Sequence, residues 1–118
     1  MNSEYIIDKK QIRMINEKYG GSLRSDAEIE TALMLGKGKS VYRKIAYLWR
    51  SILVGHPFTD GNKRTALIVA LTIIEACKIK LDEKKKENMV EEITKIAREN
   101  IEDINRIERL VRYVVTGN

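Results

Sequence analysis

The segment from His56 to Ala66 concentrates the residue types of this chain that could carry chemistry. His56 is the only histidine, and an imidazole can accept a proton near neutral pH. Asp60 offers a hard carboxylate oxygen of the kind that binds Mg²⁺ shared with phosphates. Lys63 and Arg64 then supply two adjacent cations. A proton acceptor, a metal-binding carboxylate and paired cations together predict chemistry on a metal-bound phosphate chain.

The most apolar stretch of the chain follows directly and predicts a buried helix over about 63–79. The first N–H groups of a helix have no internal acceptor and carry the positive end of its dipole, so they attract anions. Gly61 allows a positive φ or a close approach of the backbone to a ligand. Asn62, Lys63 and Arg64 add a neutral donor and two cations. Because cations are unfavourable at a helix N-terminus, their presence here indicates a bound phosphate chain.

Each of these residue types also has a simpler structural interpretation. A lone histidine beside a proline is more often an ordinary loop residue, and an Asp-Gly pair by itself is a turn signal. A Lys-Arg pair can be a solvated surface pair, and Phe58 is expected in the core under either interpretation. The functional interpretation is favoured because these residues occur together in one short segment before a helix.

Apolar residues at helical spacing predict an all-α fold of five to six helices around the 63–79 helix, with Leu71 in its core. Strand signals are nearly absent, apart from a short extended start at 5–7. The lysine-rich segment 82–86 is expected to be a surface connection. The residues expected to cap helix starts are Asp8 with Gln11, Ser25 with Glu28, Ser40 and Asn100.

The composition fits one soluble globular domain over residues 1–118, with 43% hydrophobic and 33% charged residues. One cysteine and one histidine exclude a disulfide framework and a conventional zinc site. The longest apolar stretch, 66–74, is far shorter than the roughly 20 residues of a membrane span. The N-terminus has no basic region ahead of an apolar one. We therefore expect a cytoplasmic protein with no membrane partner.

Basic residues are unevenly placed in this chain, whose formal net charge is +5. No acidic residue lies between Glu30 and Asp60, a stretch that would attract phosphates or an acidic partner, although a solvated helix face is the alternative. Aromatic residues are not interleaved with the basic ones, so direct nucleic-acid binding is not expected. A non-enzymatic basic binding module stays as an alternative. The basic residues of this stretch are Lys37, Lys39, Arg43, Lys44 and Arg50.

The segment His56-Pro57-Phe58-Thr59-Asp60-Gly61-Asn62-Lys63-Arg64 resembles the signature of the Fic/Doc (Fido) family, His-Pro-Phe-x-Asp/Glu-Gly-Asn-Gly-Arg-x-x-Arg. Lys63 stands where nucleotide-transferring members have Gly, and Leu67 where they have the second Arg. Both departures are the form of the Doc, or death-on-curing, branch. Upstream, Tyr19-Gly20-Gly21 and Glu30-Thr31-Ala32-Leu33 also resemble a Doc-type stretch. The resemblance extends over about residues 5–81.

The resemblance implies an all-α transferase that uses ATP and Mg²⁺ to modify a hydroxyl group of a target protein. It implies that His56 is the general base, that Asp60 holds the metal, and that Arg64 stabilises the charge developing in transfer. Phosphate binding then falls to Gly61, Asn62, Lys63 and Arg64 with the helix amides. Residues 22–26, and 36–40 as a second candidate, resemble the flap that aligns the target chain by main-chain pairing.

The two departures favour a Doc-like toxin that transfers a phosphoryl group, with a protein of the translation machinery as its target. Lys63 fills the space that Gly leaves for the β-phosphate, and Leu67 cannot bind an anion, although AMP transfer remains the alternative. Self-inhibited members carry Ser/Thr-x-x-x-Glu-Gly/Asn, which this chain lacks. Restraint is therefore expected in trans from a Phd-like antitoxin, whose acidic segment the acid-free stretch could receive.

Overall fold

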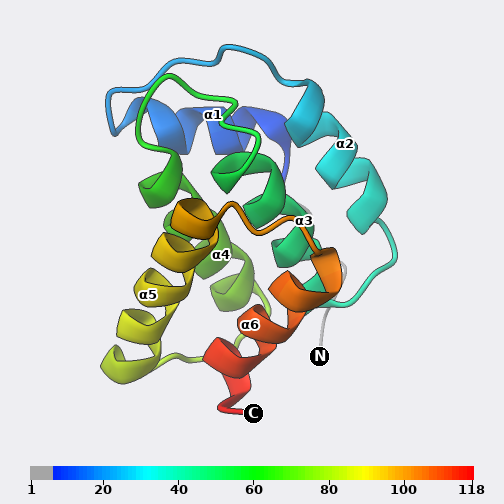
Figure 1. The fold of residues 1–118 in the computed structure, drawn as a ribbon, viewed down its shortest axis with the longest axis vertical. Helices are drawn as coiled ribbons and strands as arrows, with labels where there is room; N and C mark the ends of the chain where they lie inside the picture. Colours follow the sequence, from blue (N-terminus) through cyan, green and yellow to red (C-terminus); the bar gives the residue numbers. More distant parts are fainter. Residues whose placement is uncertain (1–6) are drawn as a thin grey trace.

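The structure, a computed structural model, describes residues 7–118, and this part of the chain forms six helices (Figure 1). No strand forms within residues 7–118, where the one β pairing is an isolated antiparallel bridge between Leu23 and Phe58. The all-α prediction is therefore confirmed. The helices are α1 (Lys9–Glu17), α2 (Ala27–Gly36), α3 (Val41–Leu53), α4 (Asn62–Ala76), α5 (Glu83–Glu99) and α6 (Ile104–Thr116).

The centre of the molecule is shared by two neighbouring helices, α3 and α4. α3 packs against α2, α4, α5 and α6, and α4 packs against α1, α3 and α5. The side chain of Trp49 on α3 is fully buried and donates from Nε1 to the carbonyl oxygen of Ala66 on α4, at 3.0 Å. This bond fixes the first turns of α4 against the core.

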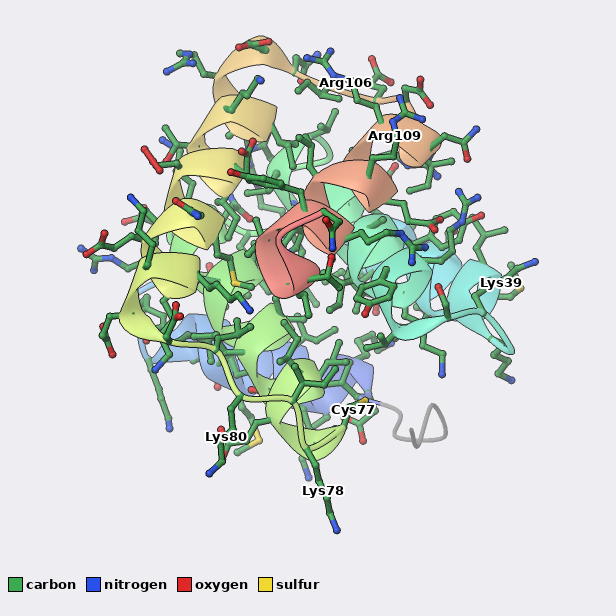
Figure 2. The ribbon with its side chains drawn as sticks, turned by 90° about the horizontal axis from the view of Figure 1, so that it is seen from below. Lys39, Cys77, Lys78, Lys80, Arg106 and Arg109 are labelled. Carbon is green, nitrogen blue, oxygen red and sulfur yellow. The ribbon has the colours of Figure 1, made fainter. Side chains whose placement is uncertain are left out.

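α4 differs from the predicted central helix at its C-terminal end. It ends at Ala76 because Lys78 takes a left-handed conformation with φ 61°, which turns the chain away, and Figure 2 shows Lys78 and Lys80 at this end. The prediction that Leu71 belongs to the core is wrong in degree. Leu71 is only partly buried, and it lines a surface hollow of about 370 Å³ together with Ile79.

The predicted helix starts are partly confirmed. Asp8 forms its capping box with Gln11, and Ser40 accepts from the N–H of Arg43 at the start of α3. The second capping box is wrong, since the N-cap of α2 is Asp26 and not Ser25. The carboxylate of Asp26 instead accepts from Lys9 Nζ at 2.8 Å, and this ammonium lowers the pKa of Asp26.

The second half of the chain brings two further corrections. Asn100 does not cap the last helix but ends α5 in a left-handed conformation, and Asp103 caps α6 by accepting from the N–H groups of Asn105 and Arg106. The segment 82–86 is not a surface connection. Asp82 accepts from the N–H of Lys85, so the lysines form the first turn of α5.

One residue ahead of α1 also belongs to the core. Ile7 is non-helical and buried, while residues 5 and 6 of the expected extended start lie outside the described residues. Among the described helices, none has the length and apolar character needed to cross a bilayer.

Candidate functional site

The loop between α3 and α4 is held in a tight turn by the side chain of Asn62. Asn62 Nδ2 donates to the carbonyl oxygen of Phe58 at 3.0 Å, and the N–H of Phe58 donates to Asn62 Oδ1 at 3.3 Å. Phe58 itself is fully buried and anchors the loop in the core, as expected. Both polar atoms of the Asn62 side chain are therefore used in hydrogen bonds within the loop. Only the main-chain N–H of Asn62 is left to bind an anion.

The start of α4 is an uncapped helix N-terminus. Gly61 is the N-cap residue and offers no side chain, and the first helical bond runs from the N–H of Thr65 to the carbonyl oxygen of Gly61. The N–H groups of residues 62–64 therefore have no helical acceptor. Gly61 has φ 72°, a conformation that favours glycine, and a Cβ there would lie in a tight contact of 3.1 Å with Tyr19 Cβ.

A hollow of about 480 Å³ opens in front of this helix start, and we call it the site hollow. Its volume lies within the roughly 300–1,000 Å³ range of small-molecule sites. The structure brings all six sequence-predicted site residues to its wall. Its lining residues are Tyr19, Leu53, His56, Thr59, Asp60, Gly61, Asn62, Lys63, Arg64 and Ala97.

The charged side chains of the site hollow have few competing partners. Neither Lys63 nor Arg64 takes part in an ion pair with any residue among 7–118. The guanidinium of Arg64 lies 5.8 Å from the centre of the Tyr19 ring, a cation–π distance. Two exposed cations thus stand beside the positive end of a helix dipole, an arrangement that favours a bound polyanion.

Asp60 is better suited to a metal ion held jointly with phosphate oxygens than to one held by protein ligands alone. One of its carboxylate oxygens accepts from the N–H of Gly61 at 2.8 Å, which leaves the other oxygen for a cation. Within the described part of the chain, no three His, Cys, Asp or Glu residues gather as a metal cage. Mg²⁺ is commonly held by one or two carboxylates plus phosphate oxygens, and Asp60 beside the cationic wall suits that mode.

His56 is presented to the site hollow by a strained backbone. Its φ of 49° is left-handed, which costs a non-glycine residue roughly 1–2 kcal/mol. Such conformations persist where surrounding contacts over-determine them. The contacts come from the segment 22–25, which lies beside the loop at the upper end of the molecule in Figure 1.

The segment 22–25, which we call the flap segment, pairs with the loop through its main chain. The N–H of Arg24 donates to the carbonyl oxygen of Pro57 at 2.7 Å, and the N–H of Thr59 donates to that of Ser22 at 2.9 Å. In this antiparallel pattern the N–H and C=O of Leu23 point away from the loop. The second flap candidate, 36–40, joins α2 to α3 and does not line the site hollow.

One positioning contact and four residues of the wall were not predicted from the sequence. Asn16 on α1 is fully buried, and its Nδ2 donates to the carbonyl oxygen of Asp60 at 2.7 Å and to Thr65 Oγ1 at 3.0 Å. The available signal was a polar residue one turn after Ile12, on the apolar face of its helix. Thr59 lies inside the predicted segment and Tyr19 inside the Tyr19-Gly20-Gly21 resemblance, but neither was assigned to the site. Leu53 and Ala97 reach the site hollow from α3 and α5, and no local pattern marks them.

Two basic residues of the acid-free stretch have partners in the C-terminal part of the chain. Arg43 pairs with Glu108 at 2.7 Å, and Arg50 reaches the carbonyl oxygen of Glu102 at 3.5 Å. Both guanidinium groups also lie over the ring of Tyr47. Of the five basic residues of the stretch, Arg43 is therefore balanced by a carboxylate from later in the chain, and Arg50 contacts a carbonyl group there.

Comparison with known families gives one match. A model described as the Fic/DOC family matches residues 4–74. This range contains the flap segment, the loop and every residue of the site hollow except Ala97. Comparison with curated proteins and with solved structures gives no match.

Proposed function

Because the chain belongs to the Fic/DOC family, whose members transfer nucleotide-derived groups to proteins, we propose that it is a Doc-type protein kinase. The observation that carries this proposal is the site hollow itself. An imidazole, a carboxylate and two cations that form no ion pair within residues 7–118 line one wall around an uncapped helix start. This combination suits transfer of the γ-phosphoryl group of ATP to a hydroxyl of a target protein.

In this proposal the phosphate chain of ATP lies against the start of α4. The free N–H groups of residues 62–64 and the side chains of Lys63 and Arg64 bind the phosphate oxygens. Mg²⁺, held by Asp60 and phosphate oxygens, would neutralise phosphate charge during transfer. Arg64 stabilises the charge that develops on the transferred group, because its guanidinium is already held beside Tyr19.

His56 acts as the general base in the proposed transfer. Its imidazole accepts the proton of the target hydroxyl while the hydroxyl oxygen forms a bond to the γ-phosphorus. The bond between that phosphorus and the β–γ bridging oxygen breaks, and ADP leaves with the electron pair. The proton then remains on His56, so the step balances without a further reactant.

Two positions on α4 favour phosphoryl transfer over AMP transfer. Lys63 lines the site hollow beside the helix start, where its side chain takes up space that a glycine would leave free. Leu67 lies one turn later, is partly buried and packs against the core, so it offers no charge for distal phosphates. We infer from both that the γ-phosphate, and not the α-phosphate, is presented to His56.

The flap segment supports a protein target. Among the described residues, the outward N–H of Leu23 donates no hydrogen bond and its C=O accepts none, so both groups can pair with one residue of an extended chain. This edge belongs to the segment that pairs with the His56 loop. A target held there would bring its hydroxyl toward the site hollow, and we propose a cytoplasmic protein of the translation machinery as that target.

Restraint of the site is proposed to come from another chain. The described residue that α5 contributes to the site hollow is Ala97, which carries no charge. Glu99, two residues later, pairs instead with Arg98 and Arg106. Because α5 presents no carboxylate to the cationic wall, we propose an acidic, Phd-like antitoxin in trans.

The proposal is tested with ATP labelled at the γ- or the α-position, Mg²⁺ and a translation extract as the source of acceptor. We expect protein-bound label from the γ-position, none from the α-position, and loss of transfer in His56→Ala. The exposed Lys10→Ala variant on α1 is the control for a general charge effect.

Two results would overturn the proposal. Label arriving from the α-position would show an AMP transferase. Absence of any transfer, together with salt-dependent nucleic-acid retention that survives both His56→Ala and Asp60→Ala, would show a basic binding module.

A further inference from the structure

We infer that Arg24 is the positioning residue of His56, and that it holds the backbone turn which presents the imidazole to the site hollow. This inference rests on the proposed function, since His56 is the base of that proposal. Arg24 lies outside the His56–Ala66 segment and does not line the site hollow. Its action is therefore on the loop and not on the substrate.

Arg24 binds three consecutive carbonyl groups of the loop. Its Nη2 donates to the carbonyl oxygen of His56 at 3.0 Å and to that of Phe58 at 3.1 Å. Its main-chain N–H donates to the carbonyl oxygen of Pro57, between the two, at 2.7 Å. One residue thus fixes the orientation of three peptide groups in succession.

The guanidinium of Arg24 has no competing carboxylate. No ion pair within residues 7–118 uses it, so its charge is directed at the two carbonyl oxygens. Hydrogen bonds from a charged donor are shorter and stronger than those from a neutral donor. The planar guanidinium also keeps both carbonyl groups turned toward one point, which a flexible donor would not do.

His56 needs this support because its backbone conformation is unfavourable on its own. With φ 49° it occupies the left-handed region, which glycine adopts readily and histidine rarely. The imidazole is exposed, and no hydrogen bond among the described residues holds its ring nitrogens. The direction of the side chain is therefore set by the backbone, and the backbone is set by Arg24.

The position of Arg24 also links the two proposed halves of the site. Arg24 follows Leu23, whose outward main-chain groups are proposed to pair with the target chain. The same flap segment therefore carries the target edge and the contact that orients the base. Loss of the Arg24 side chain should disturb His56 while the main-chain pairing of 22–25 remains.

The test uses the fact that His56 is the only histidine, so its imidazole NMR signals can be assigned without ambiguity. In Arg24→Ala we expect these signals to shift and broaden relative to the unmodified protein. Arg24→Lys keeps the charge but not the planar pair of donors, and should show a smaller change of the same kind. Arg109 is exposed on α6 (Figure 2) and does not line the site hollow, so Arg109→Ala is the matched control and should leave the signals unchanged.

Kinetics of transfer separate positioning from simple loss of structure. In Arg24→Ala we expect kcat to fall by about 100-fold, the effect of misplacing a catalytic group by roughly 1 Å, with KM for ATP nearly unchanged. Circular dichroism establishes that each variant is folded. If Arg24→Ala does not fold, Arg24→Lys carries both measurements.

The outcomes separate this inference from the proposed function. Unchanged His56 signals in a folded Arg24 variant would overturn the inference, whatever the activity. A rise in KM with kcat unchanged would also overturn it, because Arg24 would then act in substrate binding. Altered His56 signals in a protein that never transfers phosphate would support the positioning role and refute the kinase proposal.

Discussion

Asn16 on α1 and Asp60 before α4 lie 44 residues apart in sequence, yet the amide of Asn16 donates to the carbonyl oxygen of Asp60 at 2.7 Å. The same amide nitrogen donates to Thr65 Oγ1 at 3.0 Å, on the far side of the helix start. Gly21 also belongs to this joint, by which we mean the contact of Asn16 with Asp60 and Thr65, since a Cβ at position 21 would overlap both Asn16 Oδ1 and the Asp60 main chain. The loop that carries Asp60 is therefore held in place by hydrogen bonds from α1, a helix that contributes no charged side chain to the site hollow.

Asn16→Ala is expected to destabilise the fold by about 1–3 kcal/mol, because it leaves one buried and one part-buried acceptor without their donor. The change should be measured as the free energy of unfolding in urea. Glu17→Ala, on the exposed side of the same helix, is the matched control and should have little effect. Equal stability of Asn16→Ala and the unmodified protein would mean that this joint contributes nothing.

Asp60→Ala should change stability by no more than about 0.5 kcal/mol, since its carboxylate is exposed and, among the described residues, accepts only from the N–H of Gly61. Binding of Mg-ATP should nevertheless weaken, measured by calorimetry with and without Mg²⁺. ATP affinity that no longer depends on Mg²⁺ is the expected signature. A variant that unfolds would show that Asp60 is structural and would remove it from the metal site.

Ile73→Ala is expected to lower the stability of the fold and to leave Mg-ATP binding unchanged, the reverse of Asp60→Ala. Ile73 is 3% exposed within α4, so the cavity should reduce stability by about 2–5 kcal/mol. Mg-ATP affinity of the folded protein should stay unchanged. Leu71→Ala should be milder than Ile73→Ala, because Leu71 is only partly buried at the edge of a surface hollow. The reverse order in thermal unfolding would contradict the burial seen here.

The sequence was most informative where the site is contiguous. His56, Asp60 and Arg64 could be placed together because a short loop followed by a helix start brings neighbours in sequence to one wall. Asn16 and Ala97 could not be placed there, since they reach the site from helices whose packing angles no local pattern encodes.

Helix boundaries failed where two residues could cap and tertiary contacts made the choice. Both Asn100 and Asp103 can cap α6, and the helix starts at the later one because Ile101 is buried between α5 and α6, outside either helix. Similarly, Asp26 became the N-cap of α2 while its carboxylate was drawn to Lys9 on α1. Capping propensity therefore predicts which residue types can start a helix, but it does not predict the tertiary contacts that select one candidate.

Gly61→Ala should damage both the fold and the anion site. The left-handed φ of 72° costs an alanine about 1–2 kcal/mol, and its Cβ would press on Tyr19. The helix start should shift, so ATP affinity should fall together with stability. Gly38→Ala is a matched control, because Gly38 has φ 73° but open space around it and lies away from the site hollow. Loss of ATP affinity in both variants would indicate a general backbone effect.

The double variant Lys63→Gly with Leu67→Arg tests what selects the transferred group. Removing Lys63 frees space beside the helix start, and an arginine at position 67 lies one turn beyond Arg64, on the same face of α4. Because residue 67 is only partly buried, its guanidinium can extend to the surface and bind distal phosphates. We therefore expect label from the α-position of ATP to appear on protein, and label from the γ-position to decline. Leu67→Met alone keeps the volume without a charge and should transfer as the unmodified protein does. If the double variant stays folded, binds ATP and still transfers only from the γ-position, these two residues do not set the choice.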